Sequence, residues 1–290
     1  DVGGVKPYWS DYQYDQLGNR TAQFQRAVGS TPATTTTYAV GTGGASPHQV
    51  TSVTETVAGS APATTSFTYD AAGNRVTRTS SVKSSTYQWD AEGELAGDSD
   101  YSYLYDASGT RIVRTGTAGT TVYLLGGQEL TVSGSTVSAV RYYGFAGTTV
   151  AVRTGNGLGA VSSLVCDRDG TVVASVPNTN WTVAAVSRVY SDPFGAVRGG
   201  SDVGVPGDHR FLGATRDQAS GLTLLGARYY DASLGRFLSV DPILNVSVPA
   251  HLDAYSYGFN NPMTFSDASG MEPKDKNGNY DGNYYGSGSG

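Results

Sequence analysis

Residues 103–111 read YLYDASGTR, and this nine-residue pattern decides how the chain is expected to fold. In a β-strand, tyrosines two positions apart lie on the same face. The aspartate that follows them caps a turn through its own backbone, and the glycine three positions later supplies a positive φ. The pattern therefore predicts a β-hairpin with an aromatic face, in which the closing arginine begins the return strand.

The same pattern occurs at three earlier positions. It reads YQYDQLGNR at 12–20, FTYDAAGNR at 67–75 and YQWDAEGE at 87–94. The turn aspartates of the four copies are Asp15, Asp70, Asp90 and Asp106, and Asp231 has the matching position in a later stretch that reads RYYD. A single hairpin is only marginally stable, so neighbouring copies are expected to pair into a sheet.

The composition supports an all-β fold. The chain of 290 residues contains 39 glycines and 20 tyrosines, and charged residues make up 15% of it. An ordinary soluble domain has about 25% charged residues, and long helices draw on lysine and glutamate, so a helical fold is disfavoured. We predict an all-β chain whose hairpins form a curved antiparallel sheet.

Charge, cysteine and histidine content exclude several functions. A net charge of −6 argues against general affinity for nucleic acid, and no apolar run reaches the roughly 18 residues of a membrane span. Cys166 is the only cysteine, which excludes a disulfide framework and a cysteine-rich zinc site, and we expect it to be a packed strand thiol. His48, His209 and His251 lack the spacing of metal ligands. We therefore expect no metal site and no cofactor, and a structural role for His209.

A second, ordered set of motifs occupies residues 210–270. It consists of Phe211-Leu212-Gly213, Asp217, Gly221-Leu222, RYYD at 228–231, GRF at 235–237, Asp241-Pro242 and Asn260-Asn261-Pro262. With the repeats, this set resembles the YD or Rhs (rearrangement hotspot) repeats and the Rhs-associated core of bacterial polymorphic toxins and of the teneurin barrel. The resemblance covers nearly the whole chain up to Gly270.

In that family the hairpins spiral into a hollow barrel, and the core plugs one end ahead of a variable C-terminal effector. The resemblance implies a repeat shell at 1–205, an Rhs core or plug at 206–271, and a flexible tail at 272–290 that begins a truncated effector or is a linker. It implies a bacterial, secreted or cell-surface protein whose partners are its own effector and immunity or secretion-apparatus proteins. Because the chain begins in repeat-like material, we expect a fragment of a longer protein.

The resemblance also implies self-cleavage, because several family members cut their chain after the last Asp-Pro-x-Gly-Leu of the core. By that resemblance Asp241 and Asp267 are the catalytic aspartates. The cut falls between Met271 and Glu272, and Gly270 is the residue before Met271. Peptide hydrolysis by two carboxylates needs one protonated and one ionised group, and closely placed like charges create that difference.

Alternatives remain open at each step. Asp-Pro and Asp-x-x-Gly also start ordinary turns, and in this chain Ala268 replaces the family's proline and Met271 its leucine. Arg236 is a candidate to orient a catalytic carboxylate, although Arg228 and Arg236 can instead pair with acidic groups or carbonyls of the plug. The alternative function is an extracellular adhesive or carbohydrate-binding YD-repeat surface protein without proteolysis, in which tyrosines stack on sugars.

Overall fold

The computed structural model describes residues 6–199, 202, 204–243, 249–275 and 277–279. The chain divides into two compact units. The first contains residues 1–87, 236–267 and 271–290, and the second contains residues 88–235 and 268–270. Each unit therefore combines repeat strands with part of the segment that follows them.

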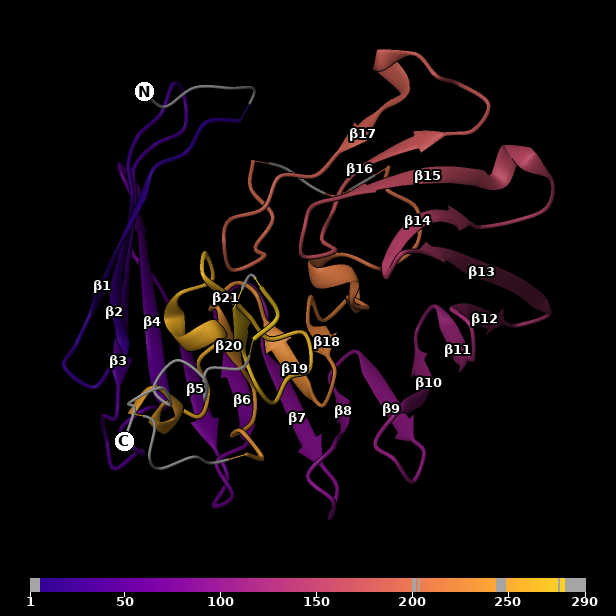
Figure 1. Cartoon of the computed structure of the whole chain (residues 1–290). Coiled ribbons are helices and arrows are strands. Elements are labelled where there is room, and N and C mark those ends of the chain that lie inside the picture. Colours follow the sequence, from indigo (N-terminus) through magenta and orange to yellow (C-terminus); the bar gives the residue numbers. More distant parts are fainter. Residues whose placement is uncertain (1–5, 200–201, 203, 244–248, 276, 280–290) are drawn as a thin grey trace, which may run out of the picture. The chain divides into compact units, whose positions relative to one another are not determined.

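The first unit is built on an antiparallel meander in which each strand pairs with the next (Figure 1). Its strands are β1 (Ser10–Tyr14), β2 (Arg20–Gln25), β3 (Thr34–Val40), β4 (Val50–Val57), β5 (Ala63–Tyr69), β6 (Arg75–Thr79) and the start of β7 (Ser85–Trp89). The C-terminal part adds β20 (Arg236–Phe237), η4 (Pro249–Leu252), η5 (Gly258–Asn260) and the antiparallel pair β21 (Phe265–Ser266) and β22 (Lys274–Asp275).

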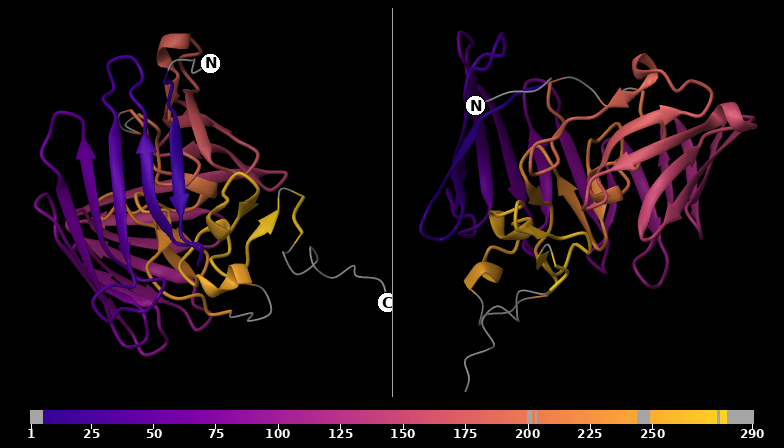
Figure 2. Two further views of the ribbon diagram at one scale, coloured as in Figure 1. Left: turned by 90° about the vertical axis from the view of Figure 1, so that its left-hand side faces the viewer. Right: turned by 45° about the horizontal axis from the view of Figure 1, so that its top comes forward.

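The second unit continues the same plan, with strands laid side by side in chain order (Figure 2). Its meander consists of β8 (Leu95–Asp98), β9 (Tyr101–Tyr105), β10 (Arg111–Gly116), β11 (Gly119–Leu124), β12 (Gln128–Ser133), β13 (Thr136–Phe145), β14 (Thr148–Arg153), β15 (Val161–Cys166), β16 (Val172–Pro177) and β17 (Ser187–Arg188). Beyond it come η3 (Phe211–Gly213) and the hairpin of β18 (Thr223–Leu225) and β19 (Arg228–Asp231); η1 (Leu158–Ala160) and η2 (Val183–Ala185) lie within the meander.

The predicted all-β, antiparallel fold is confirmed. The helices found among the described residues are 3-10 helices of three or four residues, and none is long and apolar enough to cross a membrane. Within the described part of each unit, the first and last meander strands do not pair with one another, so neither meander closes into a barrel by itself.

The turn of the repeat depends on its aspartate. Asp15, Asp70, Asp90 and Asp106 each accept the backbone N–H four residues ahead, at 2.9, 2.8, 2.8 and 3.0 Å. The glycines at the third position of these turns have φ between 78° and 91°. The same bond recurs at Asp167, Asp192 and Asp275, whereas the carboxylate of Asp231 accepts the N–H of Ser233, two residues ahead. Asp275 lies in the expected tail, of which residues 276 and 280–290 are outside the described part.

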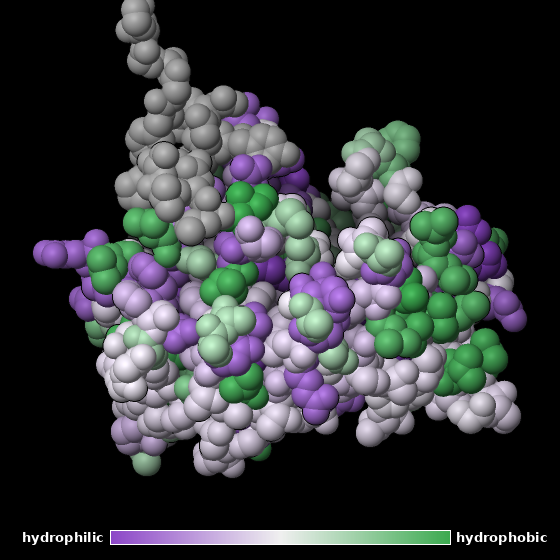
Figure 3. Space-filling model, turned by 90° about the horizontal axis from the view of Figure 1, so that it is seen from below, coloured by the Kyte–Doolittle hydropathy of each residue, from purple (hydrophilic) through white to green (hydrophobic). Residues whose placement is uncertain are grey.

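Strand alternation places aromatic and aliphatic side chains on one packed face. In the second unit the core cluster consists of Tyr142, Val152, Leu164, Val172, Val189 and Val205. On the opposite face, Leu104 and Val137 remain 61% and 64% exposed. Cys166 is half-buried on β15, as expected for a strand thiol, and burial raises its pKa. Figure 3 shows hydrophobic residues interspersed with polar ones over the face seen from below.

Candidate functional site

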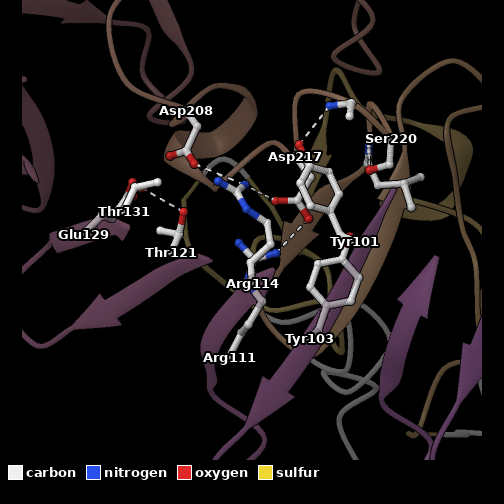
Figure 4. A network of polar contacts seen from close by, with 12 residues as sticks. Tyr101, Tyr103, Arg111, Arg114, Thr121, Glu129, Thr131, Asp208, Asp217 and Ser220 are labelled. Atoms are coloured by element: carbon white, nitrogen blue, oxygen red, sulfur yellow. Dashed lines mark hydrogen bonds and ion pairs between the residues drawn. The ribbon is translucent and has the colours of Figure 1, made fainter. Parts of the chain in front are cut away.

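A buried network of ion pairs joins β10 of the second unit to Asp217. This carboxylate is fully buried; its Oδ2 accepts Arg111 Nη1 at 2.7 Å, and its Oδ1 accepts a short bond from Arg114 Nη1 (Figure 4). Arg111 also donates to the hydroxyl of Tyr229 on β19, at 2.7 Å. Because a buried carboxylate is costly unless it is paired and hydrogen-bonded, these bonds fix residue 217 and β19 against β10.

Tyrosine rings of β9 and β11 lie against both guanidinium groups. The guanidinium carbon of Arg111 lies 4.5 Å from the ring centroid of Tyr123 and 5.5 Å from that of Tyr103, and Arg114 lies 5.1 Å from Tyr101. Such cation–π contacts offset part of the hydration that the buried cations lose. The closing arginine of the fourth repeat is thus an internal anchor, a role that its place in a single repeat did not reveal.

A second cluster lies beside this network and is organised by Tyr142 of β13. The Tyr142 hydroxyl donates to Asp208 Oδ1 at 3.0 Å and accepts the backbone N–H of Asp208 at 2.8 Å. The imidazole of His209 stacks on the Tyr142 ring, with centroids 3.6 Å apart and planes 5° apart. Glu129 of β12 places Oε1 at 3.9 Å from His209 Nε2, and Arg114 Nη1 lies 3.5 Å from Asp208 Oδ2.

The environment of this second cluster disfavours charge on two of its members. Burial, and then the neighbouring Asp208 carboxylate, raises the pKa of Glu129 from 4.5 to about 8. Burial lowers the pKa of His209 below its ordinary value. At neutral pH the environment therefore favours the protonated form of Glu129 and the neutral form of the His209 imidazole.

This raised pKa makes stability depend on pH with a defined sign. Between about pH 4.5 and 8 the folded chain keeps a proton at Glu129 that the unfolded chain releases, so the free energy of unfolding falls as pH rises. We expect Glu129→Gln to remove the fall in the free energy of unfolding that Glu129 causes over this pH range. Urea unfolding at several pH values between 4.5 and 8, in buffers that contain EDTA, measures the effect. Glu92→Gln, in the exposed turn of the third repeat, should retain it. An unchanged profile in Glu129→Gln would contradict the assignment.

In the first unit, Arg236 orients a carboxylate, and that carboxylate belongs to Asp253. The two groups form a forked pair, with Nη1 to Oδ2 at 3.1 Å and Nη2 to Oδ1 at 2.7 Å. Arg236 Nη2 also donates to the His48 carbonyl at 2.7 Å. The pairing with acidic groups or carbonyls that the sequence allowed for Arg236 is therefore what the structure contains.

The two predicted catalytic aspartates make turn-type hydrogen bonds. Asp241 Oδ1 accepts the backbone N–H of Ile243 at 2.8 Å. Asp267 is fully buried, and its Oδ1 accepts the N–H of Met271 at 3.1 Å. Met271 is 38% exposed, and Glu272 is half-buried. Asp267 thus contacts Met271, the residue whose carbonyl carbon water would attack in the predicted self-cleavage.

The chain just before the expected cut is held tightly within the second unit. The N–H of Ala227 donates to the Ser269 carbonyl at 2.9 Å, and Arg228 Nε donates to the Gly270 carbonyl at 2.5 Å. Gly226 and Gly270 adopt φ of +51° and +65°, and a Cβ on either would overlap a carbonyl oxygen of the facing segment. Ser269 and Gly270 are therefore clamped against the turn between β18 and β19.

No family model matches the chain, and no curated protein matches its sequence. Solved structures do share its fold. The TcdB2-TccC3-Cdc42 structure matches 90% of this chain with TM-score 0.60 and 20% identity. The Photorhabdus luminescens Tc holotoxin pore with a mutated TccC3 matches 92% with TM-score 0.61 and 20% identity. TcdB2-TccC3 without its hypervariable C-terminal region matches 90% with TM-score 0.60 and 19% identity. The chain spans about 15% of the length of each of these chains.

Proposed function

We propose that this chain is a section of a bacterial toxin shell, and that an effector extends from its C-terminal core. The shared fold with TcdB2-TccC3 chains supports this role, as does the resemblance of the motifs at 211–262 to the Rhs-associated core. One similar structure lacks a hypervariable C-terminal region, the place where a shell of this kind would carry its effector. The proposed protein is secreted or displayed at the cell surface, and its partners are the effector and immunity or secretion-apparatus proteins.

The observation that carries this proposal is the clamp on Ser269 and Gly270. A shell that holds an effector must fix the position of the chain at the junction between the β-sheet and the effector segment. Two backbone carbonyls of this segment are bonded to Ala227 and Arg228. The close approach at Gly226 leaves no space for a side chain. The segment is thereby positioned immediately before Met271.

We further propose that the core cuts its own chain between Met271 and Glu272. Water attacks the carbonyl carbon of Met271, the ionised member of the Asp241–Asp267 pair takes the water proton, and the protonated member gives its proton to the leaving nitrogen of Glu272. The hydrogen bond from Met271 N–H to Asp267 supports this placement. Arg236 acts as a positioning residue through its ion pair with Asp253.

The test is expression of the full chain with a reporter protein fused after residue 290. We expect two bands on a denaturing gel, with the mass of the shell band ending at Met271 and the reporter fragment beginning at Glu272. Asp267→Asn and Asp241→Asn should each give one uncut band, because either substitution removes one of the two carboxyl roles.

The matched control is Asp275→Asn. Asp275 also accepts the N–H four residues ahead, at 2.9 Å, but has no proposed part in the chemistry. The control should cut like the parent chain. An uncut parent, or equal cutting in both aspartate variants, would refute self-cleavage and leave the shell role to be judged separately.

A further inference from the structure

Three side chains with metal-ligand chemistry converge in the second unit, although they come from distant parts of the sequence. Glu129 lies on β12, and Asp208 and His209 lie between β17 and η3. One potential ligand atom from each lies within 4.8 Å of the others. The separation of 79 residues between Glu129 and Asp208 explains why the sequence predicted no metal site there.

The cluster is held in place by its surroundings. Tyr142 stacks on His209 and exchanges two hydrogen bonds with Asp208, so both side chains have fixed orientations. The Glu129 and Asp208 side chains are only 8% and 10% exposed. His209 Nδ1 is buried without a hydrogen-bond partner in the described part of the chain. A site of this kind is formed in advance rather than assembled by the ligand.

The charges around the cluster do not balance. Asp217, Asp208 and Glu129 contribute three carboxylates, against the two guanidinium groups of Arg111 and Arg114. Arg111 is committed to Asp217, and Arg114 divides its bonds between Asp217 and Asp208. Among the described residues, the group of cationic type within 4 Å of Glu129 is the His209 imidazole, whose Nε2 lies 3.9 Å from Glu129 Oε1. One buried negative charge is therefore left for a proton or a metal cation to compensate.

We propose that Glu129, Asp208 and His209 bind a divalent transition-metal ion of the Zn²⁺ type. Two carboxylate oxygens and one imidazole nitrogen form a ligand set that Zn²⁺ accepts, with a fourth position left for water. Ligand atoms around tetrahedral Zn²⁺ are about 3.4 Å apart. The three ligand atoms lie within 4.8 Å of one another, so they must draw together on binding, by about half an ångström for the 3.9 Å pair of Glu129 and His209. Arg114 then remains as the outer hydrogen-bond partner of Asp208, as metal-bound carboxylates usually require.

Binding at this site would tie β12 to the segment before η3. Carboxylate and imidazole groups bind a metal ion in their deprotonated forms, so binding should release protons and its affinity should rise with pH. The ion would stabilise the contact between β12 and the segment that precedes the core motif at 211–213.

The test uses the full chain without an affinity tag, carrying Cys166→Ser, stripped with EDTA and dialysed. Titration calorimetry with ZnCl2 should show one ion bound per chain, with proton release, and thermal unfolding should shift upward. Glu129→Gln and His209→Gln should each weaken binding at least about tenfold, since even outer-shell changes cost that much. Glu129→Gln replaces the buried carboxyl group with a neutral amide of nearly the same shape and is expected to fold, which circular dichroism can verify.

The matched control is His48→Gln. Its Nδ1 lies 3.9 Å from Asp253 Oδ1, the same spacing as in the proposed site, but that carboxylate is already held by Arg236. The control should bind Zn²⁺ like the parent. Absence of saturable binding, or affinity unchanged in both Glu129→Gln and His209→Gln, would overturn the proposal and leave a proton as the compensating charge.

Discussion

Alanine in place of Asp217 is expected to lower the free energy of unfolding of the second unit by about 3–5 kcal/mol, the usual cost of removing one partner of a buried ion pair. Asp217 is fully buried, and the side chain of Arg111 is only 2% exposed. Without the carboxylate, the Arg111 guanidinium keeps its buried position but loses its counter-charge. Arg114 loses its strongest acceptor in the same step. Urea unfolding followed by circular dichroism measures the loss.

A matched control is available on the surface of the first unit. Asp11 accepts Arg26 Nε at 2.8 Å, but the two side chains are 41% and 59% exposed. Asp11→Ala should therefore cost at most about 1 kcal/mol, as for other solvent-exposed pairs. If Asp217→Ala and Asp11→Ala lowered the free energy of unfolding by the same amount, the buried ion pairs would not be what holds residue 217 against β10.

The second large effect is expected for Gly226→Ala, in the two-residue turn between β18 and β19. A Cβ at this position would overlap the carbonyl oxygen of Ser269, and φ is +51°. The new methyl group must either push residues 268–270 away or distort the turn. Overpacking and left-handed strain together cost on the order of 3–5 kcal/mol. Hydrogen exchange should show loss of protection at Ala227, whose N–H bonds to Ser269.

Gly221→Ala separates the two causes of this loss. Gly221 also has a left-handed backbone, with φ of +76°, but among the described residues no atom beyond its chain neighbours lies within 4 Å of the added Cβ. It should cost only the backbone strain of about 1–2 kcal/mol. If both alanine variants lost the same amount, close packing of Ser269 against the turn would not be the reason. In the reporter fusion, Gly226→Ala should also slow any cut after Met271, because the clamp that positions the segment is opened.

The hairpins could be predicted because their determinants are local. Within nine residues, Asp106 accepts an N–H four positions ahead and Gly109 supplies φ of 78°. The repeat pattern did not predict the same turns at Asp167 and Asp275, because no tyrosine pair precedes either residue. An aspartate with glycine three positions later was the signal that would have found them.

The antiparallel hairpins, their turns and the tyrosine face can be predicted from the amino-acid sequence, because side-chain alternation and turn chemistry act over a few residues. Which charged side chains pair with one another depends on the tertiary fold. Arg111 finds Asp217 across 106 positions, Glu129 lies beside His209, and Arg236 pairs with Asp253. Such pairings depend on how the chain folds back over its own sheet, and strand periodicity carries no information about which buried arginine faces which carboxylate.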